Sequence, residues 1–161
     1  MPFTKYDRPA KKAAMDRTGK EENKMQERPR GNEYRNTVIC IDSYERGVPT
    51  GRFYNPAREG GTAFESLSQL LVGMEDLLNE YQLPQSFTAR RSFSSPALRP
   101  GAVAENLEQE GKKATFSVRI IFRQNASWQG SVSWLEGKQE ESFRSVLELL
   151  LLMNSALSGT N

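Results

Sequence analysis

The amino-acid sequence predicts an α+β fold in which two internally duplicated βββα units form one or two antiparallel sheets, with both helices packed on one face. A disordered N-terminal arm is expected before the first unit. Three observations lead to this prediction. A helix-like apolar pattern occurs twice, beginning at Phe64 and again at Phe143; strand-like segments precede each copy; and residues 1–36 show no apolar periodicity.

The duplication rests on an alignment without gaps between residues 37–78 and residues 116–157. The constant spacing between aligned positions, such as Phe64 and Phe143, is called the repeat offset. Eight aligned residues are identical, and in the first copy they are Ile41, Gly51, Phe64, Ser66, Leu70, Leu71, Met74 and Leu78. Most of these positions would begin a helix or line its inward face. The alternative is that two amphipathic helices with similar caps match by chance.

Chain length and charge suggest the domain boundaries. The chain has 161 residues, and each unit of about 45 residues is too small to hold a core alone, so the units should pack together. We expect one domain made of repeats 37–80 and 115–161, joined by a linker at 81–114. Residues 1–36 carry ten Lys/Arg and six Asp/Glu, a net +4, and are expected to form a flexible basic arm. Part of this linker is expected to lie on the folded body, because Phe87, Phe93 and Leu98 are apolar.

Within the first repeat, apolar runs separated by Gly- and Pro-containing turns predict strands at 38–41, 51–54 and 62–64. A helix should follow, because Ser66 and Gln69 form a capping box ahead of an apolar stripe.

The second repeat shows the same order. Residues 114–123 alternate, and those expected to face the core are Phe116, Val118, Ile120 and Phe122. Return strands are expected at 130–135 and 139–143, with a tight hairpin between them. A second helix should run from a capping box at Ser145 and Glu148 to about residue 156.

The cysteine count and the absence of long apolar runs indicate the compartment. Cys40 is the single cysteine, which excludes an internal disulfide and fits a reducing environment. No stretch approaches the ~20 apolar residues of a membrane span, and no apolar run follows the basic N-terminus. We expect a cytoplasmic protein that does not bind membranes.

Enzyme signatures are missing from the sequence. There is no histidine, no Gly-x-Ser-x-Gly motif and no Gly-rich phosphate loop. Carboxylate runs such as Glu140-Glu141 are typical of solvated faces. We therefore expect a non-enzymatic binding protein with no catalytic residue, no metal site and no cofactor.

The sheet face turned away from the core supports the most specific binding hypothesis. Strand alternation places Arg119 and Arg123 on this face, and the repeat offset places Tyr44 on the equivalent face of the first repeat. Guanidinium groups that contact phosphates, and aromatic rings that stack bases, are how single-stranded nucleic acid is held. The expected phosphate contacts are Arg52, Arg119 and Arg123, and the expected stacking residues are Tyr44, Tyr54 and Trp128. The alternative is that these are ordinary solvent-facing residues.

The two tryptophans lead to different expectations. Trp134 shares the inward parity of Val132 and is expected in the core. Trp128 lies in the turn before Gly130, where a large aromatic residue either caps the sheet edge or is exposed as an anchor for a partner.

A short segment resembles a known ligand-binding family. Arg119-x-x-x-Arg123 is followed by Asn125-x-Ser127-x-x-Gly130, which is similar to the two motifs of PilZ domains. The resemblance implies cyclic dinucleotide binding through both motifs. In that family a strand and more separates the motifs, whereas a single residue separates them in this chain.

The second helix is more apolar than the first. Leu147, Leu151 and Leu152 occupy the positions that Ser68, Val72 and Gly73 hold in the first copy. A helix that is apolar almost all round has two faces to bury. We expect a homodimer with these three leucines at its interface. The alternative function is therefore a protein-interaction or assembly module that dimerises through its second helix.

Overall fold

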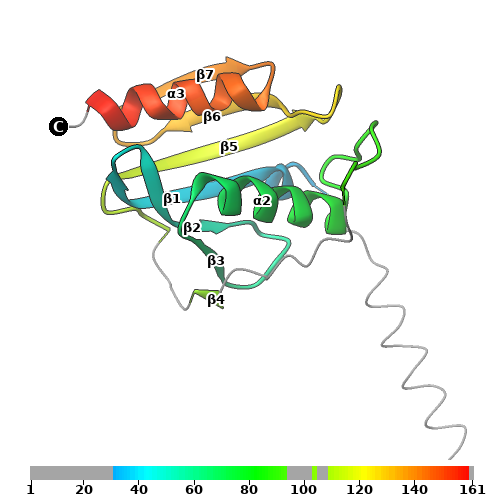
Figure 1. The fold of residues 1–161 in the computed structure, drawn as a ribbon, viewed down its shortest axis with the longest axis horizontal. Helices are drawn as coiled ribbons and strands as arrows, with labels where there is room; N and C mark the ends of the chain where they lie inside the picture. The colour runs from blue at the N-terminus through cyan, green and yellow to red at the C-terminus, as the bar shows by residue number, and fades with distance from the viewer. Residues whose placement is uncertain (1–30, 94–102, 105–108, 160–161) are drawn as a thin grey trace, which may run out of the picture.

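The computed structural model describes residues 31–93, 103–104 and 109–159 (Figure 1). Most of the expected arm therefore lies outside the described residues. Its described end is not irregular: Asn32–Arg35 forms a short 3-10 helix, η1, and strand β1 begins at Asn36.

The order of elements confirms the predicted α+β fold of two βββα units. The first unit contains β1 (Asn36–Glu45), β2 (Val48–Tyr54), β3 (Gly61–Phe64) and helix α2 (Leu67–Tyr81). The second contains β5 (Ala114–Phe122), β6 (Gln129–Trp134), β7 (Gln139–Phe143) and helix α3 (Val146–Gly159). Between them lies a very short strand, β4 (Val103–Ala104), which the sequence did not predict.

All the strands belong to one antiparallel sheet with the order β4-β3-β2-β1-β5-β6-β7. Both helices cover the same face of this sheet, as Figure 1 shows, with α2 packed on β2 and β3 and α3 packed on β6 and β7. We call this the helix face, and the opposite side the outer face. Strands β1 and β5 lie side by side at the centre and join the two repeats.

The strand register relates the repeats by an internal two-fold rotation. Val38 of β1 pairs with Ser117 of β5, and these residues are equivalent by the repeat offset, so the axis passes between them. The pair Ile41↔Gly51 recurs as Ile120↔Gly130, and a register shift follows immediately in both ladders. The offset seen in the sequence is thus an offset between equivalent structural positions.

Close backbone contacts explain why both repeats carry a glycine at this point. A Cβ atom added to Gly51 would lie 1.9 Å from the carbonyl oxygen of Cys40, and one added to Gly130 would lie 1.8 Å from that of Arg119. Neither distance is sterically possible. The irregularity in each ladder therefore requires glycine on the neighbouring strand.

The predicted helix caps are also confirmed. The Ser66 hydroxyl accepts a hydrogen bond from the Gln69 amide at 3.2 Å, and the Ser145 hydroxyl accepts one from the Glu148 amide at 3.1 Å. Behind these caps, apolar stripes of both helices face the sheet: Leu70, Met74, Leu77 and Leu78 of α2, and Leu149, Met153, Ala156 and Leu157 of α3.

Part of the linker lies on the folded body, but not through the apolar side chains that led to this expectation. The side chains of Phe87 and Phe93 are exposed and do not hold the linker there, and Leu98 falls outside the described residues. Leu83, just after α2, is buried in the core instead. At the other end of the linker, the Lys113 amide donates to the Ile41 carbonyl at 2.8 Å. The linker is thus attached to the body through backbone bonds.

Candidate binding surfaces

Two register shifts decide which face each candidate side chain occupies. The shifts lie between Ile41 and Ser43 in β1 and between Ile120 and Phe122 in β5. An extra residue reverses the alternation of every residue that follows. Tyr44 and Arg123 therefore turn to the helix face, and their predicted placement on the outer face is wrong. Phe122, predicted to face the core, is instead 52% exposed.

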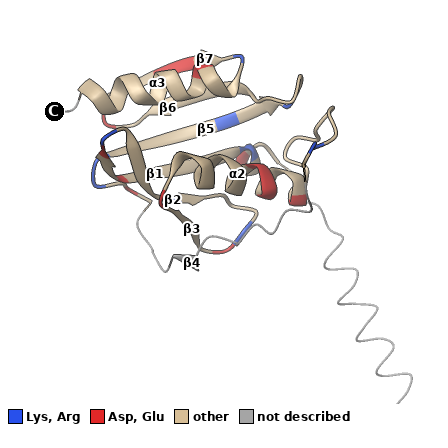
Figure 2. Cartoon of the chain, viewed as in Figure 1, with Lys and Arg blue, Asp and Glu red and all other residues tan. Residues whose placement is uncertain are grey.

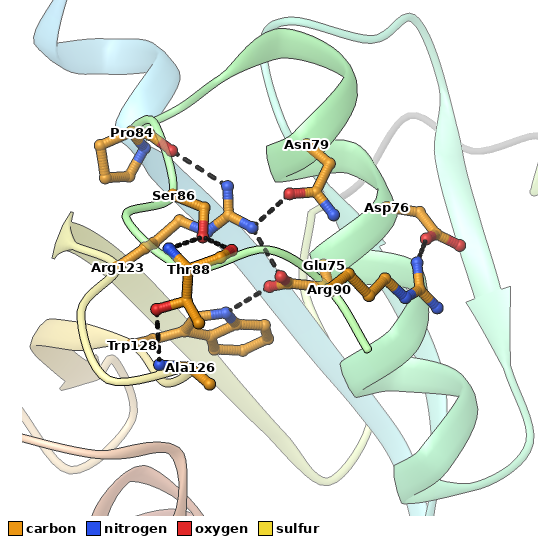
Figure 3. A network of polar contacts seen from close by, with 10 residues as sticks. All are labelled: Glu75, Asp76, Asn79, Pro84, Ser86, Thr88, Arg90, Arg123, Ala126 and Trp128. Atoms are coloured by element: carbon orange, nitrogen blue, oxygen red, sulfur yellow. Dashed lines mark hydrogen bonds and ion pairs between the residues drawn. The ribbon is translucent and has the colours of Figure 1, made fainter. Parts of the chain in front are cut away.

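Arg123 is held inside the molecule by a polar network that crosses between the repeats (Figure 3). Its Nη2 atom donates to Glu75 Oε1 at 2.6 Å and to Asn79 Oδ1 at 2.5 Å, both on α2. Its Nη1 atom donates to the carbonyl oxygen of Pro84 at 3.0 Å. The residue is 2% exposed, so the expected contact between Arg123 and phosphates conflicts with its burial.

Trp128 belongs to the same network. Its Nε1 atom donates to the other carboxylate oxygen of Glu75 at 2.7 Å, and the residue is 4% exposed. Of the two expectations for Trp128, burial agrees with the cap and not with the exposed anchor. A stacking role for this ring would require it to leave the core.

Tyr44 makes the equivalent connection at the other end of the sheet. Its hydroxyl donates to Asn154 Oδ1 of α3. By the repeat offset, Tyr44 is equivalent to Arg123, and Asn154 to Glu75. Each repeat therefore sends a polar side chain, from the end of its central strand, to the helix of the other repeat.

Arg52 and Tyr54 do lie on the outer face, as predicted, but their polar groups are already bound. Arg52 donates to Tyr54 Oη at 2.8 Å, to Asp42 Oδ2 at 2.5 Å and to the carbonyl oxygen of Glu110 at 2.8 Å. Burial acts to lower the pKa of Arg52, but the hydrogen bonds to Asp42 and Tyr54 outweigh it and raise that pKa. Tyr54 is only 5% exposed. Arg52 thus anchors the linker to the sheet through Glu110.

Cys40 lies beside Arg52 on this covered part of the outer face. It is a free, fully buried thiol, and burial raises its pKa to about 11 from an ordinary value of 9.0. A thiol in this state is a poor nucleophile because it is protonated at neutral pH.

The outer face of the second repeat is more open. Arg119 is exposed there, and it pairs with the small residue Ser131, while Phe122 lies farther along the same strand. The sequence prediction missed Phe122 because it assumed unbroken alternation. The glycine shared by both repeats, Gly130, was the available signal for a break in the ladder.

The two PilZ-like motifs do not converge on one site. Arg119 points to the outer face, whereas Arg123 points to the helix face and binds Glu75. Ser127 of the second motif accepts a hydrogen bond from the Val146 amide at 2.8 Å, which orders the start of α3. Arg123 and Ser127 therefore have structural partners within the chain.

The expected dimer surface on α3 contains two exposed leucines. Leu147 is 66% exposed and Leu151 is 60% exposed, whereas Leu152 is half-buried against the core. Leu152 therefore offers less free surface to a partner than the other two leucines. The helix contains one charged residue, Glu148, whose carboxylate accepts from Arg144 at 3.1 Å. This hydrogen bond lowers the pKa of Glu148.

A small pocket of about 130 Å³ lies between α3 and the second half of the sheet. Its lining residues are Phe116, Val132, Trp134, Gln139, Glu141, Leu152, Ser155 and Ala156. Trp134 packs against the core, in agreement with its predicted inward parity. Its Nε1 atom is buried and has no hydrogen-bond partner among the described residues. The pocket is thus lined by apolar side chains together with the acidic residue Glu141.

Comparison with known proteins assigns no function to these surfaces. No protein-family model matches the chain, and no curated protein or solved structure matches it either. Within residues 31–93, 103–104 and 109–159, no group of His, Cys, Asp or Glu side chains could hold a metal ion. None of the helices described is both long and apolar enough to cross a membrane.

Proposed function

We propose that this chain is a non-enzymatic assembly module that forms a homodimer through α3. The observation that supports this proposal is the exposure of Leu147 and Leu151, 66% and 60%, one helical turn apart on one helix face. The equivalent positions of α2 are Ser68 and Val72, so the surplus apolar surface belongs to one helix alone. Because Cys40 is kept as a thiol, we place the module in a reducing compartment, the cytoplasm.

Charge favours a second copy of the chain over a charged partner. Glu148 is the single charge of α3, and it is paired with Arg144, so two antiparallel α3 helices would meet without like-charge repulsion. A two-fold interface is self-complementary and brings the same leucines together from both copies.

The expected affinity follows from the leucines. Full burial of a leucine contributes about 1.5–3 kcal/mol, so burying the exposed part of four leucines contributes about 4–7 kcal/mol. The other contacts of the interface must offset the free-energy cost of bringing two chains together, and the leucine contribution then corresponds to dissociation constants between about 10 µM and 1 mM. The dimer should therefore be weak and depend on concentration.

Light scattering coupled to size-exclusion chromatography tests the proposal. The unaltered chain should shift from monomer to dimer as its concentration rises, and Leu147→Ser/Leu151→Ser should remain a monomer with unchanged circular dichroism. Phe122→Ser is the matched control, because Phe122 is 52% exposed but lies on the outer face of the sheet, opposite α3. If the control loses the dimer and the α3 variant keeps it, the interface is not on α3.

A second candidate function is single-stranded nucleic-acid binding, now centred on the outer face of β5. Arg119 and Phe122 are both exposed there, which combines a phosphate-binding cation with a stacking ring. In a fluorescence anisotropy titration with labelled single-stranded DNA and RNA, Arg119→Ala/Phe122→Ser should weaken salt-sensitive binding. Arg144→Ala is the control, since Arg144 is an exposed cation before α3. If both variants lose the same amount of binding affinity, general charge attraction and not a site on β5 accounts for the binding.

A further inference from the structure

Within the described part of the chain, the edge strand β7 lacks a pairing that its equivalent, β3, makes in the first repeat. In that repeat, β3 is covered by β4, with Gly61 paired to Ala104 and Thr62 paired to Val103. The repeat offset makes Glu140 and Glu141 of β7 the equivalents of Gly61 and Thr62. Among the residues the structure describes, β7 is the last strand of the sheet, and nothing pairs with its outer edge. An open edge presents backbone N–H and C=O groups to any strand that fits.

The charge of β7 determines what kind of strand fits. Four of its five residues are exposed, and Figure 2 shows acidic residues on this edge of the sheet. Pairing between β7 strands of two copies would bring glutamates against glutamates, which is unfavourable. The equivalent edge of β3, which carries no charge at its paired residues, accepts the uncharged Val103 and Ala104.

We propose that β7 binds an extended, basic peptide segment of a partner protein by strand addition. Main-chain hydrogen bonds to the open edge would provide the binding, and Glu140 and Glu141 would select for cations. Glu141 pairs with Val132 and lies on the helix face, whereas Glu140 pairs with Ser133 and lies on the outer face. An added strand alternates its side chains in the same way. The preferred segment therefore contains two adjacent Lys or Arg residues, one for each carboxylate.

The pocket described above supports the same location. Two of its lining residues, Gln139 and Glu141, belong to β7, and its volume of about 130 Å³ suits a single side chain and not a larger ligand. Such a pocket beside an open edge is how strand-binding domains add specificity to backbone pairing. This proposal does not depend on the α3 dimer, because β7 presents its backbone edge and not the exposed face of α3.

Fluorescence anisotropy with a labelled octapeptide of alternating Thr and Val around a central Lys-Arg pair tests the proposal. The unaltered chain should bind this peptide at least tenfold more tightly than a peptide with Glu-Glu at the centre. Glu140→Lys/Glu141→Lys should reverse the preference between the two peptides. Glu45→Lys/Glu59→Lys is the matched control: it changes charge equally at exposed positions outside β7 and should keep the original preference.

Two further measurements separate strand addition from general charge attraction. A Lys-Arg peptide with alternate backbone amides methylated keeps its charge but loses hydrogen bonds, and it should bind at least tenfold more weakly. Hydrogen exchange should show new protection at residues 139–143 when the unmethylated peptide is added. Equal binding of both peptides, or protection confined to other elements, would overturn the proposal. So would a Glu140→Lys/Glu141→Lys chain that folds and keeps its preference for Lys-Arg.

Discussion

Replacing Glu75 with leucine removes the acceptor shared by two buried donors from the other repeat. Glu75 Oε1 accepts from Arg123 at 2.6 Å, and Oε2 accepts from Trp128 at 2.7 Å (Figure 3). Arg123 is 2% exposed and cannot return to water without disrupting the core. In Glu75→Leu its positive charge stays buried beside the neutral oxygens of Asn79 and Pro84.

The size of the effect follows from this geometry. Removing one partner of a buried ion pair costs about 3–5 kcal/mol. The Glu75 side chain is 31% exposed, which places the cost near the lower end. We expect a loss of about 3 kcal/mol in the free energy of unfolding, including the lost Trp128 hydrogen bond. For a chain of this length, that loss lowers Tm by about 6–12 °C.

Urea denaturation followed by far-ultraviolet circular dichroism measures this difference, and two variants control it. Tyr44→Phe removes the equivalent bond to Asn154 at a more accessible site and should cost about 0.5–1.5 kcal/mol. Glu75→Leu/Arg123→Met replaces the whole pair with apolar groups and should recover most of the loss. A single variant that costs less than about 1 kcal/mol, or a double variant no more stable than the single one, would refute this reasoning.

Three further predictions concern the backbone, the thiol and the caps. Gly130→Ala should lose about 2–4 kcal/mol because its Cβ meets a carbonyl oxygen, whereas Gly159→Ala, with nothing within 4 Å, should change stability by less than about 0.5 kcal/mol; urea denaturation of both variants checks this. Burial raises the pKa of Cys40 to about 11, so between pH 9 and 11 the unfolded thiol loses its proton first, and stability should fall as pH rises. Cys40→Ala should show a smaller decrease over the same range. Ser66→Ala and Ser145→Ala should each lower the free energy of unfolding by about 1 kcal/mol, measured by thermal denaturation.

Local patterns were sufficient to predict the elements of the fold. Apolar periodicity and capping residues such as Ser66 and Ser145 are short-range features, and they located both helices. The repeat offset also predicted equivalent positions that the strand register confirms, such as Val38 and Ser117. The very short strand β4 was missed because so small a segment has no periodicity of its own.

The candidate site was harder to predict because it depends on which face of the sheet each side chain occupies. That face changes where a register shift interrupts the alternation of the strand. One extra residue after Ile120 moves Arg123 into the core and Phe122 to the surface. The same change after Ile41 turns Tyr44 toward α3. Strand periodicity also cannot predict that a segment distant in sequence covers a side chain. Arg52 is an example, because it donates a hydrogen bond to the carbonyl oxygen of Glu110 in the linker. Of the six residues expected to contact nucleic acid, Arg119 is the one exposed on the outer face.

Sedimentation equilibrium of the unaltered chain over a concentration series tests the central claim most directly, because it measures self-association without a variant that could alter the fold. We predict an average mass that rises from that of one chain toward twice that value, with a dissociation constant between about 10 µM and 1 mM. A mass that stays at that of one chain up to about 1 mM would contradict the assignment of the exposed α3 leucines to a homodimer interface.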